Sequence, residues 1–148
     1  MSKKLVAVAV SGGVDSSTAA LLLKKQSYEV LGLHMHLWHD ESHIRLESTQ
    51  NPTLEKSIDK AEKACRSLGI PLIVVGLKKE FKNCVVDYFC RGYMQGLTPN
   101  PCVMCNKYLK FGQLLEKALS LGAEYLATGH YARIKHFDKA YYLLKGID

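Results

Sequence analysis

The 148-residue sequence has no apolar run that approaches the length of a membrane-spanning helix, so we expect no membrane partner. Residues 1–4 lead directly into a short apolar segment, which predicts that no signal peptide is present. Internal repeats and low-complexity tracts are also absent. With 47% hydrophobic and 23% charged residues, a composition typical of globular proteins, the chain is expected to form one domain.

The cysteine content argues against a secreted protein stabilised by disulfide bonds. Five cysteines are an odd number, and they lack the regular spacing of a secreted disulfide scaffold. We therefore expect a cytoplasmic location, where thiols stay reduced and are available for metal binding or catalysis. The net charge of +6 suits an acidic partner such as ATP or RNA, and it does not distinguish between them.

Short apolar segments alternate with amphipathic segments along the chain. The expected strands are 5–10, 30–38, 72–77 and 125–131. The expected helices are 18–26, 53–68, 80–91 and a segment that follows Asn106 and is closed by Gly122. Two alternating segments, 132–136 and 140–144, predict a hairpin around Asp138 and Lys139. This order predicts an α/β fold, a Rossmann-like open parallel sheet with helices on both faces.

Helical periodicity predicts which side chains of these helices are buried. Thr53 is the expected N-cap of the helix 53–68. Buried side chains are predicted for the last two helices: Val85 and Phe89, then Phe111, Leu114, Leu115, Ala118 and Leu121. Three thiols are interpreted as packing residues of helices: Cys65, Cys84 and Cys90.

A glycine- and serine-rich loop, SGGVDSS at residues 11–17, lies between the first strand and the first helix. Gly12 and Gly13 let the backbone approach a ligand and take up positive φ. Unpaired N–H groups and the helix dipole favour an anion there, and four hydroxyls are added by Ser11, Ser16, Ser17 and Thr18. The spacings GxxxxGK[ST] and GxGxxG are absent, so neither of those phosphate loops is present. Asp15 is interpreted either as a metal ligand or as a helix cap.

Histidines gather near the end of the second strand. His34 and His36 share one strand face, and Met35 lies on the other. Together with His39 and His43 they invite a metal interpretation, but no carboxylate has a diagnostic spacing. We favour solvated histidines at a strand end. Met35 is interpreted either as an adenine contact, since ligands bind at this end of parallel strands, or as a core residue.

Two prolines, Pro99 and Pro101, predict a rigid non-helical loop that presents Cys102 and Cys105. A helix follows this loop. Because a thiol at a helix N-terminus has a lowered pKa, we expect Cys105 to be the reactive cysteine.

The glycine- and serine-rich loop resembles that of a known family. SGGVDSS is similar to the pyrophosphate-binding loop of the N-type ATP pyrophosphatases, which cleave ATP between its α and β phosphates. TPNPCVMCN at 98–106, followed by Lys110 and Phe111, and ATGHYAR at 127–133 complete a set of three motifs. The set resembles the tRNA-specific 2-thiouridylase family over nearly the whole chain. The resemblance implies an adenine nucleotide alpha hydrolase-like fold.

The resemblance also implies roles for residues in this sequence. ATP would contact the loop and two later positions: Ala9, Val10, Ser11, Gly12, Gly13, Val14, Asp15, Ser16, Ser17, Met35 and Gly129. The target base would contact Asn100, Pro101 and Cys102, and Cys105 takes the place of the catalytic cysteine, assisted by Cys102 and Asp15. A wall near the nucleotide or RNA would consist of His130, Tyr131 and Arg133.

The implied reaction is ATP-dependent 2-thiolation of the wobble uridine of tRNA. ATP, with Mg²⁺, adenylates the C2 oxygen of uracil so that it can leave as AMP. Sulfur from a cysteine persulfide then attacks C2, and a second cysteine releases it by forming a disulfide bond. The implied partners are the tRNA anticodon stem-loop and a sulfur donor protein.

The sequence departs from the family in two respects. Many members have Asp where Cys102 stands, and Cys102 creates a CxxC spacing with Cys105 that suits an iron–sulfur cluster completed by a third cysteine. The rival interpretation is a catalytic Cys105 with Cys102 beside the base. The family's downstream persulfide cysteine and later domains have no counterpart here. Residues 1–148 are therefore expected to be an adenylation domain truncated before the central and β-barrel domains, and incomplete for the full reaction.

Several alternatives remain open at this stage. The same loop also serves other adenylating enzymes, such as lysidine or 4-thiouridine synthetases and amidotransferase-type synthetases. A CxxC redox or iron–sulfur module and a nucleotide-binding module without catalysis belong to other classes. Five lysines are interpreted either as RNA phosphate contacts or as solvated helix faces: Lys78, Lys79, Lys82, Lys107 and Lys110.

Overall fold

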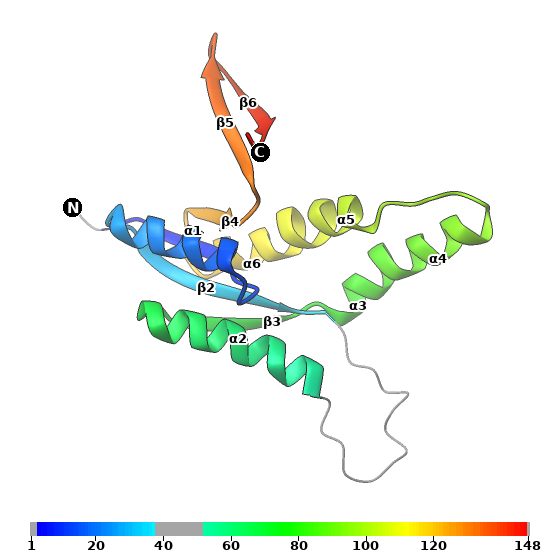
Figure 1. Ribbon diagram of the computed structural model, residues 1–148, viewed down its shortest axis with the longest axis horizontal. Coiled ribbons are helices and arrows are strands. Elements are labelled where there is room, and N and C mark those ends of the chain that lie inside the picture. Colours follow the sequence, from blue (N-terminus) through cyan, green and yellow to red (C-terminus); the bar gives the residue numbers. More distant parts are fainter. Residues whose placement is uncertain (1–2, 38–51, 148) are drawn as a thin grey trace.

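The protein is described here by a computed structural model that covers residues 3–37 and 52–147 (Figure 1). Its centre is a sheet of four strands: β1 (Leu5–Ala9), β2 (Glu29–His36), β3 (Leu72–Gly76) and β4 (Tyr125–Thr128). Their order is β3-β2-β1-β4, and every neighbouring pair is parallel. The predicted parallel sheet is therefore confirmed.

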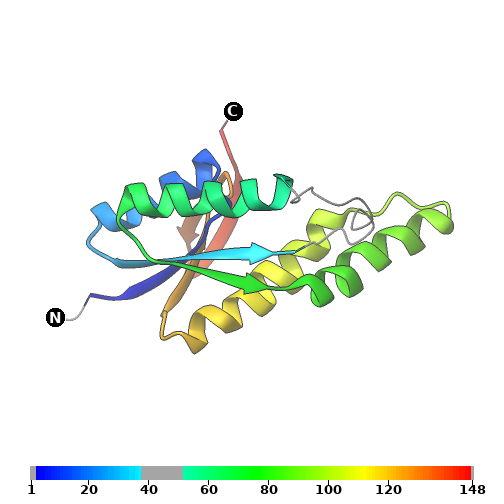
Figure 2. The ribbon, with the colours of Figure 1, turned by 90° about the horizontal axis from the view of Figure 1, so that it is seen from below.

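Helices cover both faces of this sheet, as predicted (Figure 2). On one face lie α1 (Val14–Lys25) and α2 (Pro52–Leu68). On the other lie the π-helix η3 (Cys105–Leu114) and α6 (Leu115–Ser120). Because both faces are covered, the strands are continuous apolar runs rather than alternating ones.

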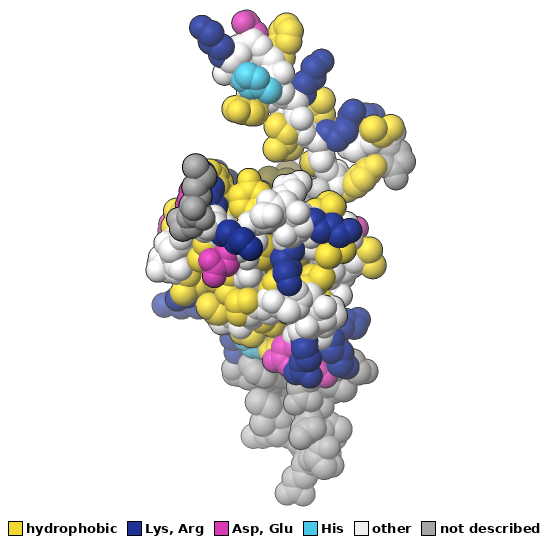
Figure 3. Space-filling view, turned by 90° about the vertical axis from the view of Figure 1, so that its left-hand side faces the viewer, with side chains coloured by type: hydrophobic (Ala, Val, Ile, Leu, Met, Phe, Trp, Pro, Cys, Tyr) yellow, Lys and Arg dark blue, Asp and Glu magenta, His cyan; other side chains and the backbone are white. Residues whose placement is uncertain are grey.

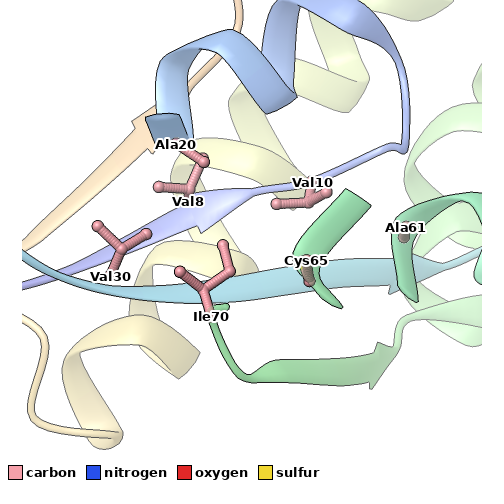
Figure 4. Close-up of a cluster of buried hydrophobic side chains, with 7 residues drawn as sticks. All are labelled: Val8, Val10, Ala20, Val30, Ala61, Cys65 and Ile70. Carbon is pink, nitrogen blue, oxygen red and sulfur yellow. The ribbon is translucent and has the colours of Figure 1, made fainter. Parts of the chain in front are cut away.

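Each face has its own hydrophobic core. Val8 packs toward α1 and α2, in a cluster completed by Val10, Ala20, Val30, Ala61, Cys65 and Ile70 (Figure 4). The neighbouring Ala7 points the other way, into a cluster with Leu31, Leu33, Leu114, Ala118 and Ala123. Cys65, Leu114 and Ala118 are buried as predicted.

A helical hairpin extends beyond the carboxyl ends of β2 and β3 (Figure 1). Its first arm consists of α3 (Lys78–Phe81), the π-helix η2 (Lys82–Val86) and α4 (Asp87–Met94). Its second arm begins with α5 (Pro101–Met104) and continues through η3 into α6. A third cluster, built on Leu77, Val85 and Leu109, joins the two arms.

Several predicted helix boundaries and buried positions were wrong. Helix α1 begins at Val14 rather than at residue 18, and α2 begins at Pro52, so Thr53 lies inside its first turn. Phe89 and Phe111 are exposed, at 36% and 51%. Both lie on the helical hairpin. The periodicity argument assumed that each helix packs along its whole apolar face, and on this hairpin part of that face stays exposed.

The predicted β-hairpin is confirmed as β5 (Ala132–Phe137) paired antiparallel with β6 (Ala140–Lys145). Asp138 and Lys139 both have positive φ, 46° and 63°, as a two-residue hairpin turn requires. The hairpin stands clear of the sheet and exposes hydrophobic and basic side chains (Figure 3). In the described ranges, the helices are too short or too polar to cross a membrane.

Candidate nucleotide-binding site

A cavity of about 370 Å³ opens at the carboxyl ends of the central strands. Ligands of open α/β sheets bind at this edge, and the volume lies in the range of small-molecule sites. Seven of the residues predicted to contact ATP line it: Ala9, Val10, Ser11, Asp15, Ser16, Met35 and Gly129. His130, predicted for the adjacent wall, lines it as well.

Six further lining residues were not assigned to the nucleotide by sequence reasoning: Leu33, His34, Leu37, Ser57, Lys110 and Thr128. Thr128 belongs to the motif at 127–133 and ends β4, so the motif itself was the available signal. Lys110, in η3, was noted beside the second motif but was not assigned to the nucleotide. Ser57 belongs to α2, and no local pattern marks it.

The N-terminus of α1 forms one side of this cavity. Its N-cap is Gly13, which has no side chain to accept a hydrogen bond from the first turn. The first N–H groups of an α-helix have no acceptor within the helix, and the helix dipole is positive at this end. Asp15 and Ser16, in that first turn, line the cavity. The predicted anion site thus begins within the helix, because Val14 to Ser17 are helical rather than loop residues.

The hydroxyls of the loop largely bond to the loop itself. Ser16 Oγ donates to the Gly13 carbonyl at 3.2 Å and accepts from the Ser11 amide at 3.3 Å. Ser17 Oγ also donates to the Gly13 carbonyl, at 2.9 Å. Ser11 Oγ accepts from the Gly13 amide at 3.4 Å. Three of the four predicted ligand hydroxyls therefore bond within the loop, and they occupy the amides of Ser11 and Gly13. The first helical amides, from Val14 on, have no acceptor within the helix and can face an anion.

Two glycines permit the close contacts around this loop. Gly12 has φ of 81°, and a Cβ there would lie 2.6 Å from the Lys60 Cβ of α2. A Cβ on Gly129 would lie 2.5 Å from the Ser16 nitrogen. Gly13 has φ of −85°, so the positive φ predicted for both loop glycines occurs only at Gly12.

His34 is buried beside the cavity, at 5% exposure, so its prediction as a solvated residue was wrong. Its Nδ1 lies 2.8 Å from the Val10 carbonyl oxygen, and its Nε2 lies 3.1 Å from Ser57 Oγ. A carbonyl oxygen only accepts, so Nδ1 carries the proton and Nε2 accepts from the Ser57 hydroxyl. His34 thereby ties β1, β2 and α2 together. His39 and His43 lie outside the described residues.

Met35 is a core residue, as one of its two sequence interpretations has it, and its contact with adenine stays a prediction. It lines the cavity and also packs against two of the hydrophobic clusters.

The predicted rigid loop around Cys102 and Cys105 was wrong, because helix α5 begins at Pro101. Proline is tolerated at the first helical position, where its missing N–H would have had no partner. Asn100 is the N-cap, and its Oδ1 accepts from the amides of Cys102 and Val103 at 3.0 and 3.4 Å. Asn100, predicted to meet the target base, thus also holds the helix that carries both thiols.

Cys105 is half-buried and packs on the cluster around Leu109, outside the cavity lining. Burial raises the pKa of the Cys105 thiol; Lys110 opposes this rise, and Cys102 adds to it. The lowered pKa predicted for Cys105 was therefore wrong, because desolvation outweighs the favourable charges.

The other thiols differ from one another. Cys84 packs against the same cluster, as predicted, whereas Cys90 is exposed and the packing role predicted for it was wrong. All five cysteines lie in the described ranges and are free, so the disulfide bond implied by the resemblance is not present.

A metal site would need several His, Cys, Asp or Glu side chains close together. In residues 3–37 and 52–147, no group of three or more His, Cys, Asp or Glu side chains could hold a metal ion. Cys102 and Cys105 thus gain no third ligand there, and the iron–sulfur interpretation has no support from the described residues. Mg²⁺ needs fewer protein ligands, since it is commonly bound by one carboxylate together with substrate phosphates. Asp15 in the cavity lining fits that requirement.

The raised pKa of Cys105 leads to a prediction about its reactivity. Alkylation of Cys105 by iodoacetamide is expected to keep accelerating above the pH at which an ordinary thiol is fully ionised. Because Lys110 lowers the pKa, a Lys110→Gln variant is expected to react more slowly at about pH 8 than a Lys107→Gln control. Mass spectrometry of the Cys105 peptide measures both rates. A rate that levels off at the pH expected of an ordinary thiol, or below it, would contradict the prediction.

Comparison with known proteins places this arrangement in a family. Residues 4–148 match the tRNA methyl transferase HUP domain. The chain belongs to this HUP-domain family. A tRNA-specific 2-thiouridylase MnmA of Clostridium perfringens is 45% identical over 148 residues, covering 100% of this chain and 41% of the relative. A second such protein, from Thermoanaerobacter sp. strain X514, is 51% identical over 146 residues, covering 97% and 40%.

These relatives confirm the resemblance that the three sequence motifs indicated. This chain spans about two-fifths of their length. A solved structure described as a predicted subunit of tRNA methyltransferase from Methanocaldococcus jannaschii has a TM-score of 0.57 and 22% identity, covering 86% of this chain and 53% of that one. At that identity the similarity supports the fold alone.

Proposed function

We propose that this HUP domain binds ATP in the cavity and adenylates an acceptor oxygen, as the activating part of tRNA 2-thiolation. The observation that carries the proposal is the N-terminus of α1, capped by Gly13 and open to a 370 Å³ cavity at the carboxyl edge of the sheet. Helix N-termini at this edge bind phosphate groups. The acceptor is proposed from the relatives, which are named tRNA-specific 2-thiouridylases.

Each part of the site has a proposed task. The backbone from Ser11 to Ser16 binds the phosphates, and Met35 and Gly129 contact the nucleoside. Asp15 would hold Mg²⁺, which neutralises phosphate charge when bound. Leu33 and Leu37 are apolar parts of the cavity lining. A fixed set of N–H donors of this kind stabilises the charge that develops on departing pyrophosphate.

The sulfur-transfer part of the reaction is proposed on the thiols of α5 and η3. Asn100, Pro101 and Cys102 would contact the target uracil of the anticodon stem-loop. The terminal sulfur of a cysteine persulfide, which a sulfur donor protein supplies, attacks C2, and AMP leaves. A second thiolate then attacks the inner sulfur, forms a disulfide and releases the thiolated base. Cys105 is proposed as one of these two thiols, in a cytoplasmic, reducing setting.

ATP–pyrophosphate exchange in the presence of an anticodon stem-loop tests the adenylation step. Asp15→Ala and Ser11→Ala are expected to lower the exchange rate about a hundredfold, because they remove groups at the phosphate site. Asp87→Ala is the matched control, since that carboxylate pairs with Lys82 on the helical hairpin. Exchange that both site variants leave unchanged would contradict the role given to the loop.

A nucleotide-binding module without catalysis is the second candidate. It is favoured by the position of Cys105, half-buried and outside the cavity lining, with a raised pKa. It predicts ATP binding by calorimetry without any exchange. The first proposal predicts both binding and exchange, with no complete thiolation by this chain alone. Thiolated tRNA formed from this chain, ATP and a sulfur donor would contradict that last expectation.

A further inference from the structure

Lys110 differs from the other residues around the cavity. Among the described lining residues, only Asp15 and Lys110 carry a full charge at neutral pH; the rest are apolar, hydroxyl-bearing or histidine residues. Lys110 is half-buried and follows Leu109, which is fully buried at 0% exposure. Lys110 is itself a lining residue, and its charge acts on His130, which also lines the cavity.

The winding of η3 brings Lys110 close to Cys105. Residues five apart on an α-helix are rotated by about 140° around the axis, so Cys105 and Lys110 would lie on different faces. In the π-helix η3, bonding from i to i+5 brings such residues close to the same face. The charge of Lys110 acts on two nearby side chains. It lowers the pKa of Cys105, although burial raises that pKa by more. It also lowers the pKa of His130, in the same direction as burial does.

The phosphate loop itself lacks a cation. The nucleoside-triphosphatase spacing ends in a lysine that contacts the β and γ phosphates, and SGGVDSS contains no lysine. The N-terminus of α1 supplies N–H groups and about half a positive charge. ATP carries several negative charges, of which this end of the helix offsets only a small part and a Mg²⁺ ion held by Asp15 would offset another part.

We propose that Lys110 binds the pyrophosphate part of ATP and supplies from a distant helix the cation that the loop lacks. The inference rests on the proposed nucleotide site and assigns a residue to it. The contact is a charge-assisted one between an ammonium and phosphate oxygens. Lys110 then faces the nucleotide, and neither of its two sequence interpretations, an RNA phosphate contact or a solvated helix face, describes its role.

The test is a set of binding measurements by calorimetry with Mg²⁺ present. The ligands are ATP, inorganic pyrophosphate, AMP and an anticodon stem-loop. Lys110→Gln is expected to weaken ATP and pyrophosphate binding at least about tenfold, which is the usual contribution of a hydrogen bond to a charged group. AMP lacks the pyrophosphate, so its binding should weaken less than about twofold. Lys110→Arg is expected to restore most of the affinity. Lys107→Gln is the control, because Lys107 is an exposed lysine of the same helix with Nζ 5.0 Å from the Tyr108 ring centre.

The outcomes separate this inference from the proposed function. ATP binding by the unaltered chain combined with wild-type affinities in Lys110→Gln would overturn the inference and leave the proposed function standing. An equal loss of AMP and pyrophosphate affinity would also overturn it, because Lys110 would then shape the cavity instead of contacting phosphate. A loss confined to stem-loop binding would overturn it too and assign Lys110 to RNA. Absence of ATP binding in the unaltered chain would overturn both proposals.

Discussion

Replacement of Gly12 by alanine is expected to abolish ATP binding and to lower the free energy of unfolding by about 3 kcal/mol. Two costs add at this position. The backbone has φ of 81°, where an L side chain is strained, and the new Cβ would lie 2.6 Å from Lys60 Cβ and 2.7 Å from the Ala61 nitrogen. The loop or α2 must therefore move, and either movement disturbs the cavity. Denaturant unfolding and calorimetric titration with ATP measure the two effects.

Gly122→Ala is the matched control for this variant. Gly122 has φ of 85°, nearly the same as that of Gly12, and among the described atoms nothing lies within 4 Å of the position that a Cβ would take there. Its substitution should cost only the backbone strain, about 1 kcal/mol, and leave ATP binding unchanged. Equal losses in the two variants would show that strain alone accounts for Gly12, and that the contact with α2 does not require glycine.

Gly129→Ala is expected to weaken ATP binding more than about tenfold with a stability loss of about 1–3 kcal/mol. The new Cβ would lie 2.5 Å from the Ser16 nitrogen and 2.7 Å from the Asp15 carbonyl carbon. These atoms belong to the first turn of α1, so the methyl group would displace the N–H groups proposed to bind phosphate. ATP titration of the variant and of the unaltered chain measures the difference.

Gly76→Ala is the control for that variant, because Gly76 ends β3 and a Cβ there meets no described atom within 4 Å. Gly76 is also outside the cavity lining. We expect its variant to bind ATP like the unaltered chain. ATP affinity that survives in Gly129→Ala would mean that the first turn of α1 can shift without loss of the ligand.

Much of the fold follows from local patterns. Alternating apolar and amphipathic segments predicted the parallel sheet, helices on both faces and the β5–β6 hairpin, and all three are confirmed. These features are set by burial and backbone geometry within a few residues, so a short window of sequence contains them. The placement of the glycine loop beside a cavity followed from the same reasoning.

Other features depended on contacts between distant segments. Periodicity marked Phe111 as buried, but it is exposed, and its ring lies 5.9 Å from that of His130. Pro101 was interpreted as a helix breaker, but it is the first residue of α5, and Asn100 caps that helix. Burial against the Leu109 cluster decided the pKa of Cys105, and the helix N-terminus did not.

The sequence by itself determined that a glycine turn and a helix N-terminus follow β1, an arrangement whose first helical N–H groups lack an acceptor within the helix. Only the tertiary structure decided which side chains share that site. His34 meets Val10 and Ser57 across 24 and 23 residues, and Lys110 arrives from a π-wound helix far along the chain from the loop. Their positions depend on how the sheet and helices pack, and packing brings together residues that no local pattern connects.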